Sequence, residues 1–206
     1  MARLLVKTVR DCALALVIAL AAGAQDSDAP LVFEFESATI DGQTNLIRAI
    51  RPTISQGDLR IVADELLATS IELDEASEWR FTGNVRLENG TAVIEADSAI
   101  FALADARLSR GEFVGAPVSF SDVGAATQTN ITGRALKMSY DDVARTLRMT
   151  GDVRMQRNKT EMQGCDIIYD FEAEGIRSGS PDCSDPFRVR VIPDSSERAP
   201  ASDAPQ

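Results

Sequence analysis

Histidine is absent from all 206 residues of the sequence. Ser-His-Asp catalysis, zinc binding through imidazole and imidazole acid–base chemistry all require that side chain, so composition excludes them. An enzyme would have to rely on paired carboxylates instead. No pair of acidic residues falls on an inward strand face at matching repeat positions. We therefore predict a protein that is not an enzyme and that uses no cofactor or metal.

Positive charge is also scarce, because 21 Lys and Arg residues face 32 Asp and Glu residues, for a net charge of −11. A protein that neutralises nucleic-acid phosphates needs clustered Lys and Arg side chains. The acidic balance therefore argues against nucleic acid as a partner.

The chain has only one sizeable apolar run near its start, Ala13 to Ala22. That run is shorter than the roughly 20 residues that span a bilayer. Basic residues precede it, and Ala22-Gly23-Ala24 follows with the small-x-small pattern of a cleavage site. We expect residues 1–24 to be a cleaved signal peptide of an exported protein. The alternative is a retained membrane anchor.

The remaining chain reads as one domain over residues 31–192. Residues 25–30 and 193–206 are rich in Ala, Asp, Ser and Pro, a composition typical of flexible ends. The domain contains two cysteines, Cys165 and Cys183, separated by 18 positions. In an oxidising compartment this pair can close a disulfide that contributes about 3 kcal/mol. The alternative is one buried thiol and one free thiol.

Helical periodicity is hard to find, and alternation with period two takes its place. It is clearest in the stretches 80–88 and 147–156, where polar side chains occupy every second position. Each stretch reads as a half-buried strand with a solvated outer face. The inward positions are Phe81, Gly83, Val85, Leu87, Leu147, Met149, Gly151, Val153 and Met155.

The two stretches are also copies of each other, since Gly151 lies 68 residues after Gly83 in matching surroundings. A variant copy surrounds Gly115, where an additional residue at Pro117 predicts a β-bulge. A glycine that recurs inside strands indicates a bend. Such bends, repeated along the chain, would curl a sheet into a trough.

A second motif alternates with the first, and residues 57–64 match residues 90–97. Weaker copies of this motif follow at residues 133–140 and 164–169. The combined unit of about 33 residues predicts layers of roughly four short strands that bury a core only through their neighbours. We interpret Asp64 and Asp97, at the ends of the first two copies, as turn formers rather than calcium ligands. Asn89-Gly90 and Asp41-Gly42 indicate tight hairpins.

The ordered series of motifs resembles the LptA/OstA-like family of lipopolysaccharide-transport proteins over residues 59–192. That span is about two thirds of the chain. The matching runs are Phe81–Val85, Gly90–Asp97, Gly115–Phe120, Gly133–Tyr140, Leu147–Val153, Gly164–Tyr169 and Val189–Pro193.

The resemblance implies an all-β fold, a rolled and open β-jellyroll of repeated antiparallel strand pairs. In that family, the apolar interior holds the acyl chains of lipopolysaccharide in the periplasm. Terminal strands pair end to end with an inner-membrane LptC-like jellyroll, an outer-membrane LptD-like jellyroll or further copies of the bridge. Transport of lipopolysaccharide to the outer membrane is therefore the expected function.

Eight inward residues are the candidate lipid contacts, and plain core packing is the competing interpretation for each of them. Four align with lipid-contacting or matching aromatic positions of the family: Leu59, Ile61, Phe120 and Tyr140. Four follow from alternation alone: Phe81, Val85, Met149 and Val153.

The chain departs from the family pattern in three places. Residues 31–58 precede the usual first strand, and the alternation over 33–36 predicts an additional layer that caps this end or alters docking there. Asp142 stands where the family tends to be apolar. The two cysteines of the domain also lie outside the pattern, and a bond between them would stiffen the C-terminal end.

Two alternative functions stay open at this point. One is the membrane-anchored LptC-like component of the same pathway, which N-terminal sequencing of the mature protein would distinguish. The other is a structural β-solenoid, such as an adhesin fragment or a polymer scaffold. A solenoid predicts a tightly filled interior without an apolar trough.

Overall fold

The computed structural model describes residues 29–69, 77–104, 107–124, 128–179, 183 and 186–193. The expected signal peptide and the end of the expected C-terminal tail lie outside these residues. Within them every regular element is a strand, as predicted, and no helix is long and apolar enough to cross a membrane. The strands are β1 Val32–Glu34, β2 Ser37–Asp41, β3 Leu46–Ile50, β4 Thr53–Gln56, β5 Leu59–Val62, β6 Glu65–Ala68, β7 Ser77–Asn89, β8 Ala92–Ala104, β9 Arg107–Val123, β10 Asn130–Asp141, β11 Thr146–Arg157, β12 Thr160–Asp170, β13 Gly175–Ser178 and β14 Arg188–Val191.

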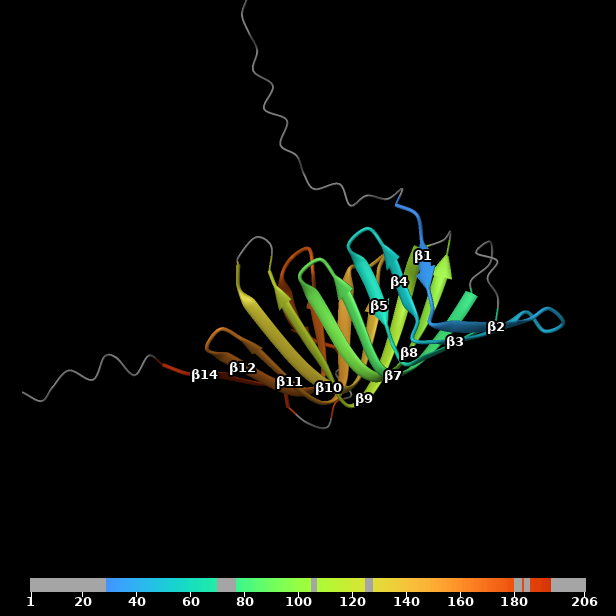
Figure 1. Ribbon diagram of the computed structural model, residues 1–206. Coiled ribbons are helices and arrows are strands. Elements are labelled where there is room, and N and C mark those ends of the chain that lie inside the picture. Colours follow the sequence, from blue (N-terminus) through green and yellow to red (C-terminus); the bar gives the residue numbers. More distant parts are fainter. Residues whose placement is uncertain are drawn as a thin grey trace, which may run out of the picture.

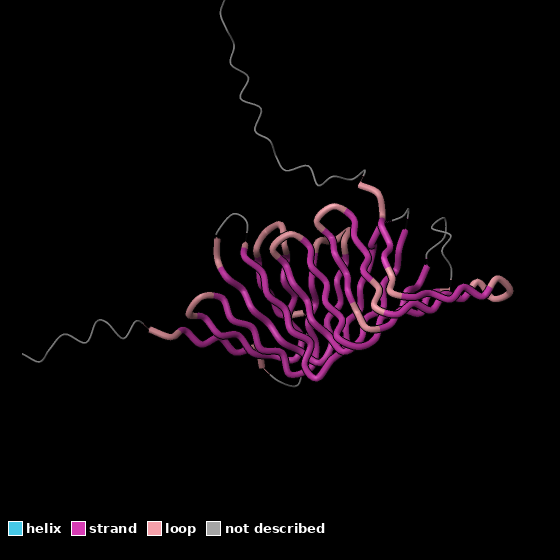
Figure 2. The backbone as a smooth tube through the Cα atoms, in the orientation of Figure 1, coloured by secondary structure: helices cyan, strands magenta, loops and turns pink. Residues whose placement is uncertain are grey.

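All strands belong to one antiparallel sheet that folds back on itself (Figure 1). Strand β7 shows how, because its first half pairs with β6 and its second half pairs with β5. The long strands β8 to β12 likewise turn midway and continue in a second layer (Figure 2). The sheet therefore has two facing layers joined along a crease.

We call the two layers wing A and wing B. Wing A contains β2, β3, β6, β13 and the segments 77–82, 98–104, 107–114, 137–141, 146–150 and 166–170. Wing B contains β1, β4, β5, β14 and the segments 85–89, 92–96, 118–123, 130–134, 153–157 and 160–164.

The recurrent glycine motif lies at the crease, where the predicted bends are confirmed. Gly83 and Asn84 both adopt positive φ, 75° and 47°, and the register of β7 against β8 shifts there. Gly151 and Asp152 repeat this geometry in β11, with φ of 78° and 45°. A two-residue bulge restores the side-chain alternation beyond it. Side chains on both sides of the bend therefore face the same interior.

The bulge predicted at Pro117 is also present. In β9 the pairing with β10 passes from Val114 to Val118 while the partner advances only from Lys137 to Ala135. The additional residues bend the longest strand of the sheet at the same crease.

The interpretation as a turn former was wrong for Asp97, whereas Asp64 does lie at the bend between β5 and β6, and both carboxylates form hydrogen bonds at the crease. Asp97 lies in the middle of β8, where its Oδ2 accepts a hydrogen bond from the Ala116 backbone N–H at 3.1 Å. Asp64 lies between β5 and β6, and its Oδ2 accepts one from Asn84 Nδ2 at 2.8 Å. A bulge leaves backbone groups outside the ladder, and these side chains supply partners for the residues that form it.

The hairpin prediction was right at one position and incomplete at the other. Asn89 pairs with Ala92 across a two-residue loop that begins with Gly90 at φ 60°. At Asp41 the hairpin has a four-residue loop instead, because Asp41 pairs with Leu46. The Asp41 Oδ1 accepts the Gln43 N–H at 2.9 Å and thereby holds the longer turn. This hydrogen bond lowers the pKa of Asp41.

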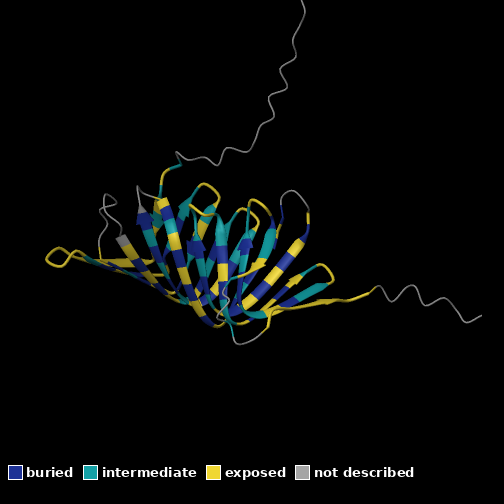
Figure 3. Ribbon diagram, turned by 180° about the vertical axis from the view of Figure 1, so that it is seen from behind, coloured by how far each residue is buried: buried dark blue, intermediate teal, exposed yellow. Residues whose placement is uncertain are grey.

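The repeat unit contains two long bent strands, not the four short strands that we predicted, since each half-strand continues into the other wing. Figure 3 shows dark and light bands along the strands, which reflect buried and exposed side chains in alternation. Inward residues from both wings form a single apolar core.

The additional N-terminal layer predicted over residues 31–58 is present. It consists of β1 to β4, and the β2–β3 hairpin extends beyond the rest of the sheet (Figure 1). At the opposite end, β13 and β14 pair with the two halves of β12. Within the described residues, each end of the sheet thus terminates in short strands.

Candidate lipid-binding interior

The eight candidate residues all lie in or against the core between the wings. Wing B supplies Leu59, Ile61, Val85, Phe120 and Val153, and wing A supplies Phe81, Tyr140 and Met149. Seven are buried, and Leu59 is partly buried against the core. The structure thus brings the candidates together on two facing surfaces.

The middle of the interior is filled by side chains. Phe101 packs edge-on against Phe81 and Phe113, with ring centroids 5.2 and 5.4 Å apart. Met138 and Met149 beside them are fully buried. These side chains all belong to wing A, and Met149 extends from it to wing B, where a Cβ at Gly133 would lie only 2.9 Å from the Met149 Sδ. The two wings are therefore in contact at this point of the core.

A narrow apolar crevice opens between the wings at the N-terminal end. Its lining residues are Leu31, Ile54, Leu59, Ile61, Trp79, Phe81, Phe101, Leu103 and Leu108. The cavity between them measures about 10 Å³. That is roughly the minimum volume for one water molecule.

Trp79, the chain's single tryptophan, lies in the wall of this crevice and is 2% exposed. Its indole Nε1 has no hydrogen-bond partner among the described residues. A buried donor without an acceptor costs about 1–3 kcal/mol. Sequence reasoning missed Trp79, although it shares the inward parity of Phe81.

The C-terminal half is closed by an aromatic cluster that joins the wings. Phe120 of wing B lies 5.7 Å from Tyr169 and 6.1 Å from Phe171, measured between ring centroids. Tyr140 and Tyr169 complete the cluster at 5.9 and 4.9 Å from Phe171. Of the predicted residues, Phe120 and Tyr140 therefore meet here, whereas Ile61 and Leu59 lie at the N-terminal crevice.

Polar groups span the same opening between the wing tips. The buried Asp122 carboxylate accepts hydrogen bonds from Tyr169 Oη at 3.1 Å and from Thr91 Oγ1 at 2.7 Å. Arg157 Nη1 donates to the Glu174 carbonyl oxygen at 3.0 Å. We call the cross-wing contacts Asp122–Tyr169 and Arg157–Glu174 the clasp. Burial, and next the charge of Asp122, raises the pKa of Tyr169.

Asp122 is a second residue that sequence reasoning missed. It lies two positions after Phe120, so strand alternation alone directs it inward. A search for inward apolar side chains does not find it, because it is acidic. A buried carboxylate is recognised only through its partners.

Asp142, which departs from the family pattern, lies at the rim. Its Oδ1 accepts hydrogen bonds from Tyr140 Oη at 2.6 Å and from Arg145 Nη1 at 3.3 Å. Burial, with a further contribution from Asp142, raises the pKa of Tyr140. The carboxylate thus orients the tyrosine hydroxyl toward the rim, and the apolar lining beneath it is kept.

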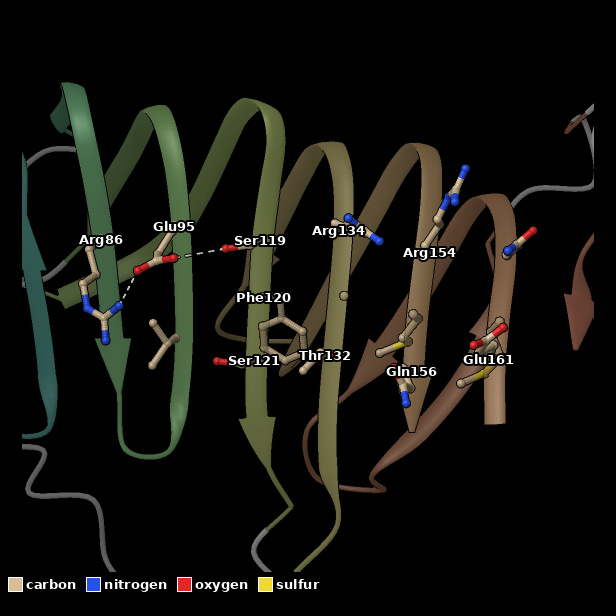
Figure 4. Close-up of a pocket in the computed structure, with 15 residues that line it drawn as sticks. Arg86, Glu95, Ser119, Phe120, Ser121, Thr132, Arg134, Arg154, Gln156 and Glu161 are labelled. Atoms are coloured by element: carbon tan, nitrogen blue, oxygen red, sulfur yellow. Dashed lines mark hydrogen bonds and ion pairs between the residues drawn. The ribbon is translucent and has the colours of Figure 1, made fainter. Parts of the chain in front are cut away.

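The outer face of wing B carries a separate depression of about 520 Å³ (Figure 4). Its polar side chains come from neighbouring strands, and Arg86 joins Glu95 at 2.5 Å. Arg134 and Arg154 stand directly opposite each other in the ladder. Phe120, Met155 and Met162, which are inward residues of wing B, also border this depression. Its charged side chains do not suit an acyl chain, whereas the apolar interior does.

Cys165 and Cys183 form a disulfide, with Cα atoms 5.9 Å apart. Cys165 lies in β12, opposite the crease bulge of β11. The bond therefore connects the last long strand to the segment between β13 and β14.

The fold and the interior define a class of protein, an open two-winged β-jellyroll with an apolar lining. Comparison with known families then shows its membership. Residues 65–174, more than half of the chain, match the family described as "LptA/(LptD N-terminal domain) LPS transport protein". The chain belongs to this family, which confirms the resemblance seen in its motifs.

A solved structure supports the same fold. The chain is similar to LptH from Pseudomonas aeruginosa, described as the LptA homologous periplasmic component of the conserved lipopolysaccharide transport device. The two share 12% sequence identity and a TM-score of 0.52, over 82% of this chain and 100% of that one. No match was found among curated proteins.

Proposed function

We propose that this protein is a periplasmic bridge component that binds lipopolysaccharide and passes it from the inner to the outer membrane. The observation that carries the proposal is the single apolar core between two facing wings, in a chain of the lipopolysaccharide-transport family. Each buried methylene is worth about 0.8 kcal/mol, so a ten-carbon acyl chain in water costs about 8 kcal/mol. A carrier needs such a lining and no catalytic group.

Because the middle of the core is filled, acyl chains enter only when the wings part. The composition of the interior supports this movement, since every methionine after Met1 is buried there: Met138, Met149, Met155 and Met162. Methionine is flexible and polarisable, which lets a core repack around a new apolar group. A rigid scaffold would have little use for such an interior, and the family membership also disfavours that alternative.

The sheet ends support the proposed partners. Strand β14 exposes Val189 and Val191, and β1 exposes Val32. An edge strand with exposed apolar side chains is a template on which a strand of another chain can pair. End-to-end pairing with LptC-like and LptD-like jellyrolls, or with a second copy, would cover these edges by strand addition. The protruding β2–β3 hairpin makes the two ends different, so we propose that they select different neighbours.

Photo-crosslinking in cells tests the proposal. A photoreactive residue at Ile61 or Phe120 should form adducts with lipopolysaccharide, because both side chains are buried between the wings. The matched control is Arg86, which lies on the outer face of wing B. Adducts that arise only from Arg86 would refute an internal lipid site.

A further inference from the structure

The N-terminal crevice combines an apolar lining with one buried donor that has no partner in the part of the chain that the structure describes. We infer that it is an acyl-chain site in which Trp79 Nε1 donates a hydrogen bond to the carbonyl oxygen of the chain's ester or amide, and that β1 is its displaceable lid. This inference rests on the proposed function and specifies where and how the lipid is held.

The chemistry of the crevice selects the ligand. Its lining is hydrocarbon and aromatic apart from the indole N–H, which is buried with no partner among the described residues. A bare alkyl chain matches the apolar lining but offers no acceptor to the indole N–H. A free phosphate or sugar would leave its own polar groups unpaired. A linked acyl chain satisfies both, because one carbonyl acceptor adjoins a long apolar tail.

The residues that close the crevice belong to the additional N-terminal layer. Leu31 forms part of its wall, and the Phe33 ring contacts Trp79 with centroids 5.0 Å apart. Only about 10 Å³ of the crevice admits water while these side chains are in place. Entry of an acyl chain therefore requires Leu31 to move away, together with the Phe33 ring, which lies two residues later and packs on Trp79.

Strand β1 is built for such movement. It has three residues, and among the described strands it pairs with β4 alone, from Val32↔Ser55 to Glu34↔Thr53. The chain is anchored directly after it, where the Glu36 N–H donates to the Ile50 carbonyl at 3.0 Å and the Glu36 carboxylate pairs with Arg51. A short edge strand opens at low cost. Ahead of β1, the Ala29 carbonyl oxygen accepts a hydrogen bond from Gln56 Nε2 at 3.1 Å, which must break when the segment before Glu36 swings and β2 stays in the sheet.

The single tryptophan provides a direct measurement, because the ¹⁵N-labelled protein has one indole N–H signal. We would titrate the whole protein with monomeric dioctanoyl phosphatidylcholine and with its dioctyl ether analogue, which lacks the carbonyls. The ester should shift the indole signal downfield and bind about five-fold more tightly, the value of one net hydrogen bond. Trp79→Phe should bind both lipids equally.

Equal affinity of the native protein for ester and ether, or an indole signal that does not move, would overturn the assignment of Trp79. The native-protein spectrum decides this point even if Trp79→Phe does not fold.

The lid is tested with Phe33→Ala and its matched control Val32→Ala, since Val32 lies in the same strand and is exposed. Removing the lid side chain should tighten binding of both lipids several-fold, because the closed state no longer competes. The control should leave affinity unchanged. Weaker binding by Phe33→Ala would show that Phe33 contacts the lipid and is no lid.

The outcome is separable from that of the proposed function. If lipopolysaccharide adducts form at Phe120 but the indole signal of Trp79 does not move on lipid binding, only the acyl-chain site in the N-terminal crevice is refuted. Loss of adducts at both Ile61 and Phe120 would refute the internal lipid site as a whole.

Discussion

The two halves of the interior are closed in different ways. At the N-terminal end the contact between wings is apolar, made by Leu31 and Phe33 against a tryptophan whose N–H lacks a partner among the described residues. In the C-terminal half the wings are joined by an aromatic cluster and by the clasp. Hydrogen bonds to a buried carboxylate are costly to break, whereas a short edge strand is not. The difference indicates that the interior opens first at the N-terminal end.

The largest expected effect compares the crease in the two halves. Gly83 and Gly151 both adopt positive φ, but a Cβ at Gly83 would lie 2.9 Å from the Asp64 Cβ, whereas at Gly151 it would meet the exposed Leu136 at 3.1 Å. Gly83→Ala should therefore cost about 2–5 kcal/mol, from backbone strain and overpacking together. Gly151→Ala should cost about 1–2 kcal/mol, from the backbone alone. Urea unfolding measures both, and equal losses would contradict the role of Asp64 at the crease.

The next effect tests the clasp. Tyr169→Phe removes one donor to the buried Asp122 carboxylate and should destabilise the protein by about 1–3 kcal/mol. Tyr140→Phe is the control, because its partner Asp142 is partly solvated and keeps Arg145. We expect that substitution to cost less than about 1 kcal/mol. If both variants unfold at the same denaturant concentration, the clasp does not distinguish the C-terminal half.

The smallest effect is a dependence on alkaline pH. Burial raises the pKa of Tyr169 and of Tyr140, so the folded state retains protons that the unfolded chain loses above about pH 10. Their contribution to stability is complete below that pH and declines as the pH rises through the folded-state pKa values. Thermal midpoints measured from pH 8 to 11 should fall at the alkaline end. Tyr169→Phe should fall less steeply than the native protein, and identical slopes would count against this assignment.

Much of the architecture was predictable from local patterns. Alternation around Val85 and Val153 indicated strands with one buried face, because side chains project to opposite faces of a strand. The glycine at 83, 115 and 151 indicated repeated bends, and the structure places all three at the crease. The additional N-terminal strands were also visible, since Phe33 and Phe35 alternate with acidic residues.

Other features could not be predicted because they depend on contacts between distant segments. Asp122 and Tyr169 are 47 positions apart and meet only when the wings face each other. Asp64 and Asp97 resemble ordinary turn residues until the bulges opposite them are seen. Trp79 shares the inward parity of Phe81, but nothing in the sequence shows that its N–H has no acceptor among the described residues, because that depends on its surroundings.

Local sequence patterns were enough to establish that this protein is all β, that its strands bend at recurrent glycines and that the stretches 80–88 and 147–156 each have one apolar face. These properties follow from side-chain periodicity and backbone freedom, which act between near neighbours along the chain. Only the tertiary structure decided which halves of the strands face each other. It also decided that the interior is clasped at Asp122 and covered by β1 at Trp79, because hydrogen bonding and packing across the wings depend on their arrangement in space.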